Sequence, residues 1–183
     1  MLNTQELQQS DSTHYLHPFT DAKSLKKKGA RVITRAEGIY LWDSDGNRLL
    51  DGMAGLWCVN VGYGRKVLAL TAMRQLEELP YYNTFFQTTH PPAVALSEKL
   101  AELSPPGFNR VFLVNSCSEA NDTVLRMIRR YWALMDQPQR RVVISRINAY
   151  HGSTVASASM GGQSFIHKID GLPIPEIEHI EEP

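Results

Sequence analysis

The stretch VFLVNSCSEANDTVLRMIRR, which runs from Val111 to Arg130, predicts an apolar strand that turns directly into an amphipathic helix. Its first five residues are apolar apart from Asn115, and most are β-branched or aromatic, which is typical of a buried strand in a parallel sheet. From Ala120 to Met135 the apolar residues recur at helical spacing and form one stripe, as on a helix that covers a sheet. The predicted fold class is therefore α/β.

The turn between this strand and this helix consists of Ser116, Cys117 and Ser118. Backbone N–H groups without partners and the positive end of the helix dipole are found at such a turn, and serine hydroxyls add further donors, so an anion is favoured there. A second interpretation also fits these residues. Ser116 with Glu119 three residues later is the pattern of a capping box, which only starts a helix. The residues alone leave both interpretations open.

A second apolar run, Arg141 to Ser145, follows the helix and completes a predicted βαβ unit. Ligands of such sheets lie beyond the carboxyl ends of the strands. The segment Tyr150-His151-Gly152 leaves that end of the second strand, as the serine turn leaves the end of the first. We therefore expect these two motifs, which are distant in the sequence, to converge on one crevice.

The N-terminal half predicts smaller elements. Short apolar runs between Arg31 and Asp51, separated by Gly38 and by Asp45-Gly46, indicate an antiparallel meander. Helices are expected over 65–79 and 91–103, because apolar residues recur at helical spacing and Pro80 stops the first.

Two loops of this half hold large aromatic side chains. The glycine-rich segment from Gly52 to Gly64 carries Trp57, which either packs in the core or forms the wall of a pocket. The loop of residues 80–90 holds four aromatic residues without a clear period, and loops of this kind often serve binding or a subunit contact.

The composition is that of an ordinary globular protein. The chain has 183 residues, of which 43% are hydrophobic and 21% charged, with 19 Lys and Arg against 19 Asp and Glu. This neutral balance gives no support to a nucleic-acid or membrane partner. Cys58 and Cys117 match no metal-ligand spacing, so we expect reduced thiols, no metal site and a cytoplasmic location. No run approaches the roughly 18 apolar residues of a membrane span.

Three separated motifs together resemble the class III aminotransferases, which use pyridoxal 5′-phosphate. The motifs are the serine turn, the segment from Ala149 to Thr154, and the segment from Leu56 to Gly64. The closest likeness is to the ω-transaminases that act on amines with pyruvate, and it extends from about His17 to the last residue. The resemblance implies a transferase that moves an amino group from an amine or amino acid donor to a keto acid, and a homodimer for full-length members.

The resemblance also assigns roles to residues of this chain. Residues expected to contact the cofactor are Ser116, Cys117 and Ser118 at the phosphate, Tyr150 stacked on the pyridine ring, and His151 and Gly152, which complete the motif. Residues expected to line the substrate pocket are Leu56, Trp57 and Phe85. One departure from the family concerns Cys117, because the family commonly has glycine there. A Cβ at that position could narrow the phosphate site or force a less favourable φ.

The implied architecture is fold type I of the pyridoxal-phosphate-dependent transferases, with the N-terminal part of the small domain and the first strands of the large parallel-sheet domain. Expected regions are an N-terminal segment with the meander over 1–64, a connecting helix and aromatic loop over 65–90, and the start of the cofactor domain over 91–183. The catalytic lysine and the acidic partner of the pyridine nitrogen belong to later parts of family members, and no lysine of this chain matches the family's lysine motif. Two hypotheses follow: an aminotransferase represented by an N-terminal fragment, or a catalytically inactive remnant that at most binds a partner.

Overall fold

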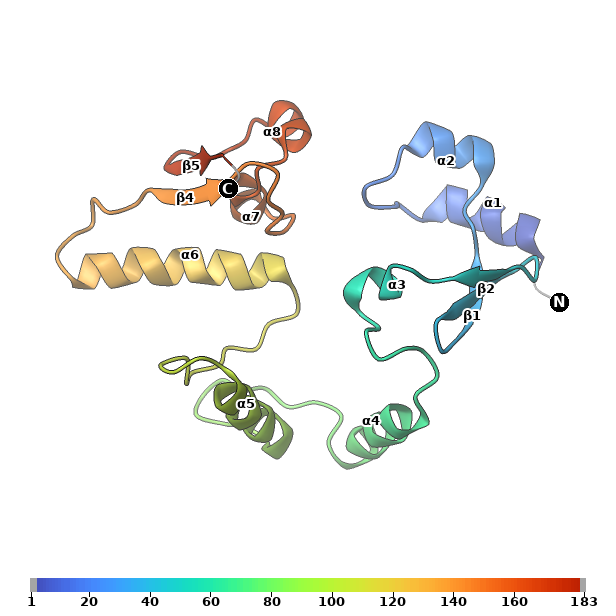
Figure 1. The fold of residues 1–183 in the computed structure, drawn as a ribbon, viewed down its shortest axis with the longest axis horizontal. Helices are drawn as coiled ribbons and strands as arrows, with labels where there is room; N and C mark the ends of the chain where they lie inside the picture. Colours follow the sequence, from blue (N-terminus) through green and yellow to red (C-terminus); the bar gives the residue numbers. More distant parts are fainter. Residues whose placement is uncertain (1–2, 182–183) are drawn as a thin grey trace. The chain divides into compact units, whose positions relative to one another are not determined.

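The computed structural model describes residues 3–181, and the chain forms two compact units, Met1–Thr89 and His90–Pro183. Figure 1 shows the elements of both units in the order of the sequence.

The N-terminal unit contains the predicted antiparallel meander. Strands β1 (Ile33–Glu37), β2 (Tyr40–Asp43) and β3 (Arg48–Leu50) pair in this order, and both pairs are antiparallel. Gly46 has a φ of 85°, the positive value that the tight turn between β2 and β3 requires. The prediction of the meander is confirmed. Helices α1 (Thr4–His14) and α2 (Ala22–Lys28) precede it, and both begin at an Asn or Asp whose side chain caps the helix.

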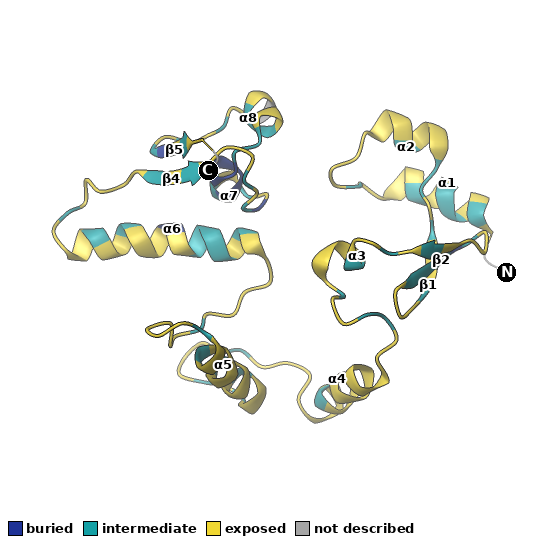
Figure 2. Ribbon diagram, in the orientation of Figure 1, coloured by how far each residue is buried: buried dark blue, intermediate teal, exposed yellow. Residues whose placement is uncertain are grey.

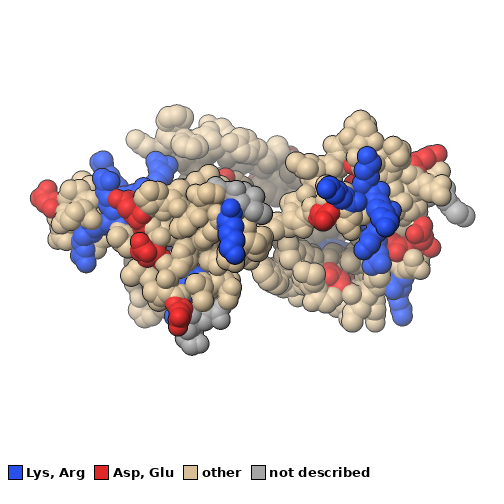
Figure 3. Space-filling view, turned by 90° about the horizontal axis from the view of Figure 1, so that it is seen from above, with Lys and Arg blue, Asp and Glu red and all other residues tan. Residues whose placement is uncertain are grey.

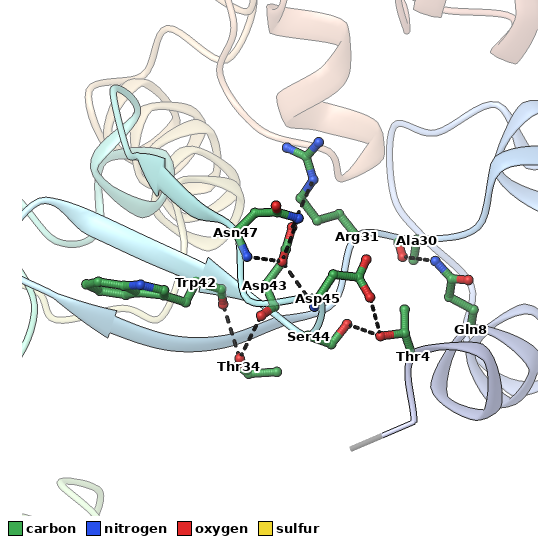
Figure 4. Close-up of polar contacts among 10 residues, drawn as sticks. All are labelled: Thr4, Gln8, Ala30, Arg31, Thr34, Trp42, Asp43, Ser44, Asp45 and Asn47. Atoms are coloured by element: carbon green, nitrogen blue, oxygen red, sulfur yellow. Dashed lines mark hydrogen bonds and ion pairs between the residues drawn. The ribbon is translucent and has the colours of Figure 1, made fainter. Parts of the chain in front are cut away.

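The turn between β2 and β3 is organised by the buried carboxylate of Asp43 (Figure 4). The Asp43 carboxylate accepts hydrogen bonds from the Asn47 side chain at 3.1 and 3.2 Å, and from the backbone N–H groups of Asn47 and Asp45. The Asn47 side chain first, and then these N–H groups and the Arg31 guanidinium, lower the pKa of Asp43 against the opposing effect of burial. Thr4 of α1 bonds to Ser44 and Asp45, which fixes the helix to this turn.

The helices expected beyond the meander form as predicted. Helix α4 spans Lys66–Glu78 and helix α5 spans Pro91–Leu103, the latter with proline at its first two positions, where a missing N–H costs no hydrogen bond. A short element, α3 (Ala54–Trp57), lies within the glycine-rich segment.

The C-terminal unit is α/β. After α5 come α6 (Cys117–Leu134), β4 (Val143–Arg146), α7 (Val155–Met160), α8 (Ser164–Asp170) and β5 (Ile177–Ile180). Strands β4 and β5 are parallel, with Val143 opposite Ile177, and α7 and α8 form the crossover between them. The long amphipathic helix and a parallel sheet are thus confirmed. Glu176 accepts ion pairs from Arg129 on α6 at 3.1 Å and from Arg141 before β4 at 3.7 Å, and these bonds join the helix to the start of both strands.

The predicted strand from Val111 to Asn115 is wrong for this structure. These residues form no strand, and Phe112 and Leu113 are 69% and 48% exposed. The sheet of this unit contains only β4 and β5 among the described residues, so no strand pairs with 111–115. A strand needs a hydrogen-bonded neighbour, and apolar sequence alone does not supply one. The predicted βαβ unit therefore lacks its first strand.

Large apolar side chains are exposed in both units, and Figure 2 shows few buried positions outside α7. The buried hydrophobic residues among those described are Leu125, Ala158, Met160 and Ile177. On α6, the predicted apolar stripe remains exposed at Met127, Tyr131 and other positions. Burial of such a face is the main source of helix stability in proteins, and much of this face of α6 is open to solvent.

Charged side chains of both signs are interspersed on each unit (Figure 3). Five basic side chains are exposed in and just after α2: Lys23, Lys26, Lys27, Lys28 and Arg31. Within residues 3–181, no helix combines the length and the apolar character that crossing a membrane requires. The described residues also contain no group of three or more His, Cys, Asp or Glu side chains that could hold a metal ion.

Candidate cofactor site

The serine turn begins α6 with a complete side-chain cap. Ser116 Oγ accepts a hydrogen bond from the backbone N–H of Glu119 at 3.2 Å, and the Glu119 carboxylate accepts one from the N–H of Asn115 at 2.7 Å. The capping interpretation is therefore confirmed, with the glutamate reaching one residue further back than in the usual capping box. These two hydrogen bonds do not involve the backbone N–H groups of Cys117 and Ser118, which stay available to a ligand.

The second predicted motif lies directly against this turn. The backbone N–H of Ser153 donates to Ser118 Oγ at 2.9 Å, and Asn121 Nδ2 donates to the carbonyl oxygen of His151 at 2.6 Å. Ser157 of α7, which is fully buried, donates from Oγ to the Ser118 carbonyl at 3.1 Å. The expected convergence of the two motifs is confirmed by these contacts, which span 30 to 39 residues of sequence.

Gly152 is the point of closest approach between the motifs. It is buried and has a φ of +133°. A Cβ at this position would lie 2.5 Å from Ser118 Oγ and 2.8 Å from both Ser118 Cα and Ser157 Cβ. Only glycine fits this conformation and this gap. The glycine of the second motif therefore lets the chain after Tyr150 pass over the first turn of α6.

Three donors remain at the turn once these bonds are counted. Among the described hydrogen bonds, none uses the backbone N–H of Cys117 or Ser118, which are the first two of α6. Ser118 Oγ accepts from Ser153, so its own hydrogen is available for donation. Together with the helix dipole, these donors suit a phosphate or another anion. The donor set thus fits the phosphate of pyridoxal 5′-phosphate.

Cys117 is exposed, and its thiol forms no disulfide. It is the first residue of α6 and is not among the residues with positive φ. The less favourable φ considered for a non-glycine residue at this position is therefore not present. The Cβ of Cys117 belongs to an ordinary helical turn.

The remaining residues of the second motif flank this contact. Tyr150 is 47% exposed, and His151 is half-buried and holds Asn121 through its backbone carbonyl. A ring at the position of Tyr150 could stack on a flat ligand. The roles of Tyr150 and His151 at the cofactor stay predictions.

The predicted substrate residues belong to the N-terminal unit. Leu56 and Trp57 lie on α3 and are 60% and 76% exposed. Phe85 is 72% exposed in the aromatic loop, where the centroid of its ring lies 6.1 Å from that of Phe86. Their roles in a substrate pocket also stay predictions.

Sequence reasoning missed two groups of residues. Asn121, Ser153 and Ser157 hold the two motifs together; the first two lie in or beside the quoted motifs, but only the fold shows their contacts. Asp51 and Tyr63 form a hydrogen bond of 2.7 Å across the glycine-rich segment, and no local pattern signals a pair 12 residues apart.

With its parallel pair of strands and its capped helix α6, the chain has the fold of type I pyridoxal-phosphate-dependent transferases over the part of that fold that it covers. The chain belongs to the class-III aminotransferases, whose family model matches residues 23–183. It is 59% identical over 180 residues to the putrescine–pyruvate aminotransferase of Pseudomonas aeruginosa, covering 98% of this chain and 40% of that protein. It is 44% identical over 153 residues to the diaminobutyrate–2-oxoglutarate transaminase of Halomonas elongata, covering 84% and 33%.

Solved structures agree with this family. An (S)-enantioselective omega-transaminase from Thermomicrobium roseum superposes with a TM-score of 0.95 at 38% identity, over 100% of this chain and 41% of that one. The omega-transaminase of Pseudomonas jessenii in complex with PMP gives 0.94 at 39% identity, over 97% and 39%. A tryptophan-to-glycine variant engineered for asymmetric synthesis of enantiopure bulky amines gives 0.94 at 38% identity, with the same coverage. The chain spans between a third and two fifths of the length of these relatives.

Proposed function

We propose that this chain provides the cofactor-phosphate site and part of the substrate pocket of an aminotransferase that moves an amino group from an amine or amino acid donor to a keto acid such as pyruvate. The observation that carries the proposal is the contact of Ser118 with Gly152 and Ser153, which joins two family motifs at the start of a long helix. The relatives with named activities are transaminases, and one solved relative holds PMP.

In this proposal the phosphate of pyridoxal 5′-phosphate is held by the backbone N–H groups of Cys117 and Ser118 and by the Ser118 hydroxyl. The cap formed by Ser116 and Glu119 keeps these donors pointing in one direction, because it fixes the first turn of α6. The bond from the Ser153 N–H orients the Ser118 hydroxyl, so its hydrogen is directed away from Ser153. A rigid set of donors costs little reorganisation when the anion binds.

When bound, pyridoxal 5′-phosphate supplies the electron sink that makes the exchange of an amino group feasible. The part played by this chain is to bind and orient. The ring of Tyr150 supports the flat face of the cofactor, and His151 and Gly152 shape the segment that carries it. No lysine here matches the family's lysine motif, so the proton-transferring group belongs to the rest of a complete aminotransferase.

Leu56, Trp57 and Phe85 form walls of the substrate pocket in this proposal. One of the solved relatives was engineered for bulky amines and carries a tryptophan replaced by glycine. Trp57 is an exposed tryptophan at the end of the short element α3, a position from which a large ring limits the size of an amine. The donor class is therefore an amine or amino acid whose size is limited by these side chains.

A chimera tests this proposal. Residues 1–183 replace the matching 180-residue portion of the Pseudomonas aeruginosa enzyme, so the missing lysine motif is supplied. We expect amine-dependent conversion of pyruvate to alanine, and a larger accepted amine for Trp57→Gly than for the parent chimera. A folded chimera that binds the cofactor but transfers no amino group from any amine or amino acid would contradict the proposal.

A further inference from the structure

The backbone of α3 is left-handed although three of its four residues are not glycine. Its four residues have positive φ values: 48° at Ala54, 59° at Gly55, 60° at Leu56 and 67° at Trp57. The L configuration disfavours this conformation, and residues other than glycine adopt it singly rather than in runs. Strain of this kind persists only where surrounding groups determine the conformation, and it gathers at functional sites.

The carboxylate of Asp51 supplies that determination. Its Oδ1 accepts the backbone N–H of Met53 at 3.1 Å, and its Oδ2 accepts the N–H of Gly55 at 2.8 Å. The N–H groups of the two residues that flank Ala54 are thus bound to one side chain. These bonds set the direction in which the chain enters the left-handed turn.

Tyr63 closes the same segment from its far end. Its hydroxyl donates to Asp51 Oδ2 at 2.7 Å, and its backbone exchanges hydrogen bonds of 2.8 and 3.2 Å with Gly38 in the meander. The hydroxyl also lies against α3 itself, because a Cβ on Gly55 would meet it at 2.9 Å. Tyr63 therefore ties the glycine-rich segment to the turn between β1 and β2 and to the Asp51 carboxylate at once.

We propose that Asp51 and Tyr63 are positioning residues: together they hold the left-handed turn that presents Leu56 and Trp57. The value of this positioning to an enzyme rests on the proposed function, in which Trp57 lines the substrate pocket. The hydrogen bonds themselves do not depend on cofactor or substrate. A charged acceptor that receives three hydrogen bonds forms a stronger clamp than neutral partners would.

The test uses the 183-residue chain and the variants Tyr63→Phe and Asp51→Asn. Tyr63→Phe removes one hydroxyl and keeps the ring. Tyr40→Phe is the matched control, because it removes a hydroxyl from the same unit while the ring keeps its contact with Arg48. Backbone amide exchange is followed by NMR at Gly55, where the N–H binds Asp51, and in the strands of the meander.

We expect the amide of Gly55 to exchange at least several-fold faster in both variants, with strand amides unchanged and Tyr40→Phe like the parent. The emission anisotropy of Trp57, obtained by subtracting the signal of the matching Trp57→Phe chain, should fall in both variants. Unchanged exchange and anisotropy in Tyr63→Phe would overturn the inference. Faster exchange throughout β1, β2 and β3 in both variants would also overturn it, because the pair would then support the whole unit. Neither result involves cofactor binding or turnover, so a failed chimera would leave this test intact.

Discussion

Replacing Gly152 by alanine perturbs the contact between the two motifs most directly. The new Cβ would lie 2.8 Å from Ser118 Cα and 2.5 Å from Ser118 Oγ. The hydroxyl can rotate away, but Ser118 Cα belongs to the backbone of α6 and moves only with the helix. Overpacking of this kind costs about 1–3 kcal/mol. A non-glycine residue held at a disfavoured positive φ adds about 1–3 kcal/mol, so we expect a total destabilisation of about 2–6 kcal/mol.

Urea unfolding followed by circular dichroism measures this loss in the chimera, with Gly171→Ala as the control. Gly171 also has a positive φ, of 65°, but a Cβ there would meet nothing within 4 Å. Gly171→Ala therefore reports the cost of a positive φ in the left-handed region, and the excess cost of Gly152→Ala reports the contact together with its more strained backbone. Equal losses in the two variants would refute the close approach of Gly152 to α6.

Three further predictions concern other residues. Cys117→Gly should leave cofactor affinity unchanged in a titration followed by absorbance, because Cys117 has no positive φ to relieve; tighter binding would show that its Cβ obstructs the phosphate. The pKa of Tyr63 is raised above 10.0, first by its hydrogen bond to Asp51, then by burial and by the negative charges of Asp51 and Cys58. The contribution of the Tyr63 hydroxyl to the stability of the turn is therefore complete below pH 10.0 and lost as the pH rises through the higher folded pKa. The Trp57 anisotropy should fall over that rise in the parent and not in Tyr63→Phe. The 183-residue chain by itself should show no pyruvate-dependent turnover, since it has no matching lysine; turnover by the purified chain would contradict this.

Local sequence patterns predicted the elements that depend on local physics. The meander follows from short apolar runs broken by turn residues, and Gly46 adopts the positive φ expected of it. Helices α4 and α5 begin and end within a residue of their expected limits. The cap of α6 was readable because Ser116 and Glu119 stand at the required spacing.

Strand pairing depends on distant segments, which the local sequence does not indicate. Val111 to Asn115 is apolar enough for a strand, but pairing needs a neighbour, and none is present among the described residues. The strand that does pair with β4 is β5, at Ile177–Ile180, which carries no distinctive pattern.

The same contrast between local patterns and long-range contacts applies to the candidate site. The two motifs could be placed at one crevice from the rule for parallel sheets, although the strand expected to carry the first motif does not form. The contacts of Ser153 and Asn121, and the left-handed turn held by Asp51, could not be predicted, because they join residues whose separation only the fold determines.

The central claim is that the turn from Ser116 to Ser118 holds the cofactor phosphate, and one titration tests it most directly. Pyridoxamine 5′-phosphate and pyridoxamine, which lack an aldehyde that could react with lysines, are titrated into the chimera, its Ser118→Ala variant and a Ser97→Ala control. Ser97 bonds only within its own helix, to the Ala93 carbonyl, among the described contacts. We expect the parent and the control to prefer the phosphorylated ligand, and Ser118→Ala to lose about 1.5–3 kcal/mol of that preference, about ten- to 150-fold in affinity. An unchanged preference in Ser118→Ala would contradict the role of its hydroxyl at the phosphate, and no preference in the parent would contradict the phosphate site itself.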